Sequence, residues 1–160
     1  MINDYFHITV RKSLGLLIPI ESALSVVTCL RQEICPIPGV ASPVKGVFNQ
    51  QGELFWVLSF GDLLGLPQGS ENNTHQKLTV VILTSPTESD IRFGGVVNTL
   101  EGLVSLSKDS ITPVPTKFRS QARSMLAGVA SIENQKAAIL NVPKVFQHCQ
   151  SAFRPHSLVS

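Results

Sequence analysis

Short apolar segments separated by frequent turn residues dominate the pattern of this chain. Between Phe6 and Val10 apolar and polar residues alternate, which places Phe6, Ile8 and Val10 on one face, as in a half-buried strand. Residues 78–84 form a continuous apolar run rich in β-branched side chains, which is typical of a strand buried on both faces. No window keeps a helical period for more than about three turns. The pattern therefore predicts a mainly β protein.

The other apolar segments are equally short and are bounded by Pro, Gly, Asn or Asp. Further strands are expected at residues 16–20, 23–29, 44–48, 53–60, 92–98, 102–106, 126–132 and 137–142. Pro143 suits the first turn of a helix, which we expect to run to about residue 150. About nine or ten short strands with closely spaced turns favour small barrels or a sandwich and disfavour a βαβ architecture.

Two polar segments are predicted to be hairpin turns between consecutive strands. Residues 49–52 form the first, a four-residue turn in which Gly52 can take a positive φ. Residues 133–136 form the second. We assign Gly46 and Gly52 as structural turn residues.

Length and charge limit the classes of function. The 160 residues suit one domain, and 15% charged residues is well below the usual share of about 25%. The net charge is +2, and the closest basic cluster, Lys117, Arg119 and Arg123, lacks the density of a surface that tracks phosphates. We therefore expect no nucleic-acid binding. Without a signal peptide or a membrane-spanning apolar run, and with three cysteines, the chain is expected to be cytoplasmic with free thiols.

Catalytic and metal-binding patterns are not found in the sequence. His148 and Cys149 are adjacent, but neighbouring residues of a helix point about 100° apart and do not face each other. Cys29 and Cys35 have no second pair of Cys or His residues at ligand spacing. We expect no catalytic residue, no metal and no cofactor.

One ordered set of segments is more specific than any of these patterns. A Pro-containing strand, residues 17–27, is followed by a Pro-Ile-Pro loop within residues 33–39. Val44-Lys45-Gly46-Val47 and the turn ending at Gly52 come next, and residues 79–82, 94–98, 103–106, 111–115 and 126–142 continue the series. In this order the segments resemble the CheW-like domain family over roughly residues 5–147.

The resemblance implies one domain over residues 1–160, mainly β, with two linked five-stranded β-barrel subdomains, a hydrophobic groove between them and a short C-terminal helix. The expected divisions are subdomain 1 at about 14–66, subdomain 2 at about 77–132, terminal segments 1–13 and 133–152 that close the barrels, and a tail at 153–160. It also implies an adaptor without enzymatic activity. The implied partners are the regulatory domain of a CheA-type histidine kinase and the cytoplasmic tip of a methyl-accepting receptor. Recruitment to membrane-associated receptor arrays would then occur without membrane insertion.

The candidate partner-binding residues follow from the same resemblance, position by position. The receptor groove would include Ser25, Val27, Gln51 and Val80, and the kinase side would include Lys45. The family usually has Arg where this chain has Gln51, and Asp where it has Asn98, so several charged contact positions are neutral here. We expect a divergent member of a chemotaxis, phototaxis or pilus-motility pathway.

Three other interpretations remain open at this point. The protein could be a barrel that binds a small ligand in the cleft between the barrels. It could be a CheW-like regulatory module without receptor coupling, or a hydrolase that uses Cys149 or a serine.

Overall fold

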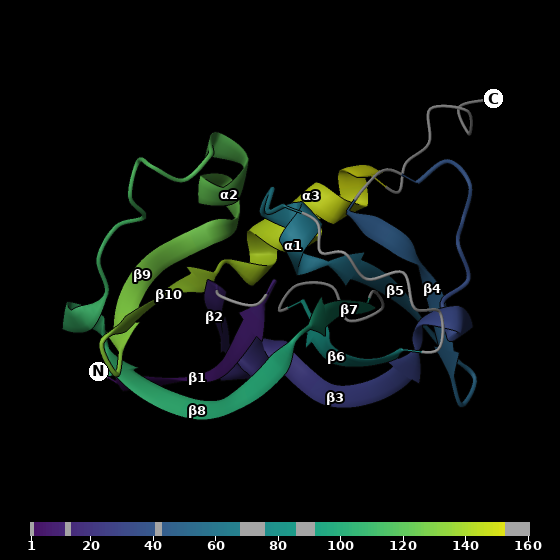
Figure 1. The fold of residues 1–160 in the computed structure, drawn as a ribbon, viewed down its shortest axis with the longest axis horizontal. Helices are drawn as coiled ribbons and strands as arrows, with labels where there is room; N and C mark the ends of the chain where they lie inside the picture. The colour runs from purple at the N-terminus through teal and green to yellow at the C-terminus, as the bar shows by residue number, and fades with distance from the viewer. Residues whose placement is uncertain (1, 12–13, 41–42, 68–75, 86–91, 153–160) are drawn as a thin grey trace.

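The computed structural model describes residues 2–11, 14–40, 43–67, 76–85 and 92–152 (Figure 1). Within these residues the chain forms two five-stranded sheets, three α-helices and three short 3₁₀ helices. The mainly β class with two five-stranded units and a short C-terminal helix is confirmed.

The two sheets are built from different sets of strands. Sheet A has the order β8 (Thr99–Ser107), β1 (Ile2–Val10), β2 (Leu14–Pro19), β10 (Gln135–Leu140) and β9 (Leu126–Ile132). Sheet B has the order β3 (Ala23–Leu30), β6 (Lys77–Thr84), β7 (Arg92–Val97), β5 (Glu53–Ser59) and β4 (Val44–Gln50).

The helices connect and cover these sheets. They are α1 (Phe60–Leu63), α2 (Ser120–Met125), α3 (Val142–Ala152), η1 (Ile20–Ser22), η2 (Arg31–Glu33) and η3 (Lys108–Ser110). In Figure 1 the three α-helices lie along the upper side of the molecule, whereas β3 and β8 run along its lower side. Among the described residues, no helix is long and apolar enough to span a bilayer.

The two sheets have the same internal arrangement. The strands β8, β9, β10, β1 and β2 of sheet A take the places that β3, β4, β5, β6 and β7 take in sheet B. In both sheets one inner pair is parallel, β10 with β2 and β5 with β7, and the other pairs are antiparallel. The edge strands β3 and β8 are therefore equivalent.

Neither sheet is closed by a continuous ladder, in contrast to the barrels expected from the sequence. In sheet B, Cys35, which follows β3 and η2, forms an isolated bridge to Val47 of β4. In sheet A, Thr112, which follows β8 and η3, forms an equivalent bridge to Val129 of β9. The 3₁₀ turns η2 and η3 end the ladders of β3 and β8, because a tightly wound turn cannot continue strand pairing. Among the described residues, one bridge therefore connects the edge segments of each sheet.

The sheets divide the chain differently from the expected subdomain boundaries. Residues 14–19, expected at the start of subdomain 1, form β2 and pair with β1 in sheet A. Residues 77–97, expected in subdomain 2, include β6 and β7, which lie inside sheet B. The reason is that strand membership depends on long-range register, whereas the expected boundaries followed chain order. The predicted tail at 153–160 lies outside the described residues.

The largest core cluster lies between the two sheets and joins them. It contains fully buried residues from both sheets and from α3, among them Ile8, Leu16, Val81, Leu83, Phe93 and Phe146. The rings of Phe93 and Phe146 meet edge to face, with centroids 4.8 Å apart. A smaller cluster fills the inner face of each sheet. Residues on both faces of β6 are buried in these clusters, which confirms that residues 78–84 form a strand buried on both faces.

The hairpin between β4 and β5 is shorter than expected. Its loop has two residues, Gln51 with φ 53° and Gly52 with φ 89°, as in a type I′ turn. The side chain of Asn49 accepts a hydrogen bond from the backbone N–H of Gly52 at 3.0 Å. Gly46 lies in a bulge of β4 rather than in a turn. A Cβ atom there would overlap the carbonyl oxygen of Cys35.

Candidate interaction surface at the sheet edges

Exposed apolar side chains gather on the two equivalent edge strands, β3 and β8. We call these residues, with one from the neighbouring η1, the apolar edge: Ile20, Leu24, Val26, Leu100 and Leu103. Leu103 is 61% exposed and Leu24 is 52% exposed. Contiguous groups of exposed apolar side chains are typical of surfaces that other proteins cover.

Strand register shows how the apolar edge relates to the core. Val26 lies opposite Val81 of β6, which belongs to the cluster between the sheets. Leu103 lies opposite Phe6 of β1, which packs against the same cluster. Paired residues project from the same face of a sheet, so both strands extend the core between the sheets to the surface. In Figure 1 both strands follow the lower side of the molecule.

Two of the predicted receptor-groove residues lie on β3 but on its other face. Ser25 lies opposite Ile82, and Val27 lies opposite Val80, on the face that lines the interior of sheet B. Ser25 is exposed and Val27 is half-buried. Residues 23–29 are apolar on both faces of the strand, so the sequence pattern gave no means of telling the partner-facing positions from the inward ones.

Val80 requires a correction. Its side chain is only 1% exposed and packs with Val57 and Ile82 inside sheet B. A partner therefore cannot reach it in this structure. In a strand every second residue points to the same face, and Val80 is on the face that points into the interior of sheet B.

Gln51 lies in the β4–β5 hairpin, whereas Ser25 and Val27 lie on β3. It is exposed at the tip of the β4–β5 hairpin. The bridge between Cys35 and Val47 joins the two edges of this sheet, β3 and β4, but among the described residues no strand pairing links the hairpin to Ser25 or Val27.

Lys45, predicted on the kinase side, is part of an ion network that links the two sheets. Its ammonium lies 2.6 Å from Asp62 Oδ2, and the guanidinium of Arg11 donates to Asp62 Oδ1 at 2.7 Å. Arg11 follows β1 of sheet A, whereas Asp62 lies in α1 beside sheet B. Arg11 also donates to the carbonyl of Pro67 at 2.6 Å. Lys45 therefore stabilises the junction in addition to being partly exposed.

The charges in this network determine the ionisation of Asp62. Burial by itself raises the pKa of Asp62, but hydrogen bonds and positive charge from Lys45 and Arg11 outweigh it and hold the pKa below its ordinary value. A carboxyl whose pKa is lower in the folded state stabilises the fold above its unfolded pKa. That contribution is lost as the pH falls through the folded pKa.

We expect Asp62→Asn to lower the free energy of unfolding by about 1–2 kcal/mol at neutral pH, because two cations lose their shared partner. The partial exposure of Lys45 keeps the effect below that of a fully buried pair. Urea unfolding at pH 7 and at about pH 3 measures it. Asp109→Asn, an exposed change, is the control. An equal loss from Asp62→Asn at both pH values would contradict the assignment.

The cysteine candidate for catalysis is a core residue. Cys149 is fully buried in α3, and burial raises its pKa to about 12. The thiol therefore stays protonated near neutral pH and cannot act as a thiolate nucleophile. Within the part of the chain that the structure describes, no three potential metal ligands gather.

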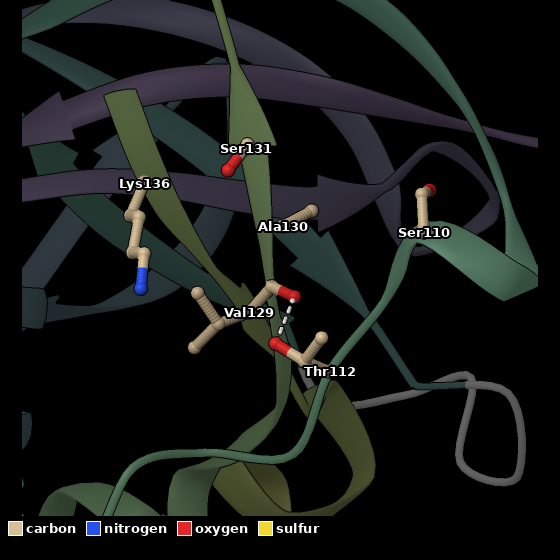
Figure 2. A pocket seen from close by; sticks show the side chains of 6 residues that line it. All are labelled: Ser110, Thr112, Val129, Ala130, Ser131 and Lys136. Atoms are coloured by element: carbon tan, nitrogen blue, oxygen red, sulfur yellow. Dashed lines mark hydrogen bonds between the residues drawn. The ribbon is translucent and has the colours of Figure 1, made fainter. Parts of the chain in front are cut away.

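A shallow hollow of about 250 Å³ lies at one edge of sheet A (Figure 2). Its lining residues come from η3, the segment after it, β9 and β10: Ser110, Thr112, Val129, Ala130, Ser131 and Lys136. The hydroxyl of Thr112 donates to the carbonyl of Val129, another lining residue, at 3.2 Å. This hollow belongs to one sheet, so it is not the cleft between barrels expected for a small ligand.

Comparison with known proteins agrees with this architecture. Among solved structures, the chain is similar to the scaffolding protein TtCheW from Thermoanaerobacter tengcongensis, with a TM-score of 0.71 and 16% sequence identity. The alignment covers 88% of this chain and 90% of that chain, and at this identity it shows the fold. No match to a curated protein was found. The family model described as the CheW-like domain matches residues 4–150, and the chain therefore belongs to the CheW-like domain family.

Proposed function

We propose that this protein is a signalling adaptor that couples a CheA-type histidine kinase to the cytoplasmic tips of methyl-accepting receptors. It would act in the cytoplasm, next to receptor arrays, in a chemotaxis, phototaxis or pilus-motility pathway. It would bind both partners and leave the chemistry to the kinase.

The apolar edge is the observation that supports the proposal beyond family membership. Two equivalent strands, one from each sheet, carry exposed leucine and valine side chains that continue the core between the sheets. An amphipathic helix of a receptor tip can cover such a surface with its own apolar face. A rigid β-framework keeps both strands in place, which lowers the entropic cost of binding.

We expect Val26→Asp and Leu103→Asp each to weaken binding of a purified receptor tip about tenfold. A carboxylate introduced into a contact that becomes dry on binding costs roughly 1–2 kcal/mol or more. Titration by isothermal calorimetry measures the change, and circular dichroism verifies that each variant is folded.

Leu54→Asp is the matched control for this experiment. Leu54 is 64% exposed, close to the 61% of Leu103, but it lies on β5 near the β4–β5 hairpin tip. The proposal predicts unchanged receptor binding for this variant. Gln51→Glu, at the same hairpin, tests the position that the sequence assigned to the groove. If only the hairpin variants lose binding, the receptor contacts the hairpin and not the apolar edge.

A further inference from the structure

The helical side of the molecule carries a second surface feature, a group of cations that no carboxylate of the described residues pairs with. The side chains of Lys117, Arg119, Arg123 and Lys144 are all exposed, and we call them the basic face. Arg119 and Arg123 are one helical turn apart, where like charges repel by about 0.2–0.5 kcal/mol. Neither of the two ion pairs among the described residues involves any of the four.

Contacts between elements hold the basic face together. The side chain of Gln121 donates to the carbonyl of Leu63 at 3.0 Å, which anchors α2 to α1. The backbone N–H of Asn141 donates to the carbonyl of Met125 at 2.8 Å, which joins the start of α3 to the end of α2. Arg123 lies two residues before Met125, and Lys144 lies three residues after Asn141, so this hydrogen bond brings their segments together.

Carboxylates are scarce in this part of the chain. Between residues 110 and 160 the sequence contains a single acidic residue, Glu133. Glu133 lies in the β9–β10 turn, at the far end of β9 from α2, about 20 Å away along the strand. The nearby carboxylate of α1, Asp62, is already paired with Arg11 and Lys45. Among the described residues, the positive charge of the basic face is therefore not paired with a carboxylate.

We propose that the basic face binds an acidic segment of a partner protein, at a site separate from the apolar edge. In Figure 1, α2 and α3 lie on the upper side of the molecule and β3 and β8 on its lower side, so both surfaces can be occupied at once. Complementary charge guides such a segment to the surface and increases its association rate.

Two other anionic partners fit the surface less well. Stable binding to an anionic membrane combines basic residues with inserted apolar side chains, and here the apolar edge lies on the other side of the molecule. Nucleic-acid binding draws on many phosphate contacts or on aromatic stacking, and the basic face offers four cations and no aromatic residue.

The test uses a short fluorescent peptide of alternating Glu and Ser, and a second peptide with Gln in place of Glu. We expect the full-length protein to bind the Glu peptide at low salt, and to bind it less tightly as NaCl screens the charges. Arg119→Glu/Arg123→Glu should weaken binding about tenfold or more. The matched double variant Lys77→Glu/Lys136→Glu changes the net charge equally at exposed positions elsewhere, and it should keep the parent affinity within about twofold.

Hydrogen exchange locates the bound peptide independently of affinity. Protection of residues 117–125 and of α3 is the expected result. Equal binding of the Glu and Gln peptides, or equal losses in the two double variants, would overturn the proposal. The proposal would also fail if an oligo-dT strand or phosphatidylserine vesicles bound more tightly than the Glu peptide and the Arg119→Glu/Arg123→Glu change abolished that binding. The peptide test does not use receptor binding, which the Val26→Asp variant tests. The outcome of the peptide test is therefore independent of the proposed adaptor function.

Discussion

Replacement of Val80 by Asp is expected to unfold sheet B rather than to weaken one contact with a partner. Val80 is 1% exposed and lies within the cluster inside this sheet, directly against Gly94 of β7. A carboxylate there has neither a cation nor a hydrogen-bond donor to compensate for lost hydration, so its burial costs several kcal/mol. That is a large part of the roughly 5–15 kcal/mol by which a domain is stable. Urea unfolding followed by circular dichroism measures the loss.

Val26→Asp is the control for this substitution. It places the same charge on the neighbouring strand, at a position that is 39% exposed, and should lower the stability by no more than about 1 kcal/mol. Should Val80→Asp unfold at the same urea concentration as Val26→Asp, the side chain of Val80 would have to face solvent, and the register of β6 would be incorrect.

The second large effect is expected at Gly46, where the bridge from Cys35 meets β4. A Cβ atom at Gly46 would overlap the carbonyl oxygen of Cys35 and lie 2.7 Å from its carbonyl carbon. This carbonyl cannot move away easily, because it accepts from Val47 N at 2.9 Å while Cys35 N donates to Val47 O at 2.8 Å. We therefore expect Gly46→Ala to cost about 3 kcal/mol and to lower the Tm by roughly 10 °C.

The chain offers two glycines for comparison. Gly52 also has a positive φ, 89°, but among the described residues no atom lies within 4 Å of the place that a Cβ would occupy, so Gly52→Ala should cost only about 1 kcal/mol. Gly128 is the equivalent of Gly46 in sheet A. A Cβ there would lie 2.6 Å from Ile111 Cγ2, a side-chain atom that can shift, and 3.0 Å from the carbonyl oxygen of Thr112, which is farther than a Cβ at Gly46 would lie from the carbonyl oxygen of Cys35. The expected order of destabilisation is Gly46, Gly128, Gly52. Differential scanning calorimetry gives this order, and equal losses at Gly46 and Gly52 would show that the bridge adds no steric restriction.

The sequence did not predict which residues of β3 form the apolar edge. Leu24 and Val26 belong to it, whereas Ser25 and Val27 lie on the face that lines the interior of sheet B. The short β-rich segment 23–29 predicts a strand, and the strand is present as β3. Both of its faces are apolar, so the pattern could not distinguish the face that turns inward. That choice depends on β6, which follows more than forty residues later and pairs with β3 in one register only.

The basic face could also be predicted only in part from the sequence. The sequence gives the scarcity of acidic residues after residue 110, but Lys117, Arg119 and Arg123 alone are a sparse cluster. Only the packing of α2 against α1 and α3 adds Lys144 to them. Only the pairing of Asp62 with Arg11 and Lys45 removes the nearest carboxylate.

By itself, the sequence determined that the chain is mainly β, that its strands are short, that a helix follows the last strand, and that the chain resembles CheW-like domains. These features follow from local periodicity, turn residues and ordered motifs, which are all properties of neighbouring positions. The tertiary structure decided which strands share a sheet, which residues of β3 and β8 reach solvent, and which charges are paired. Those outcomes depend on register and packing between segments distant in the sequence, and local patterns do not contain that information.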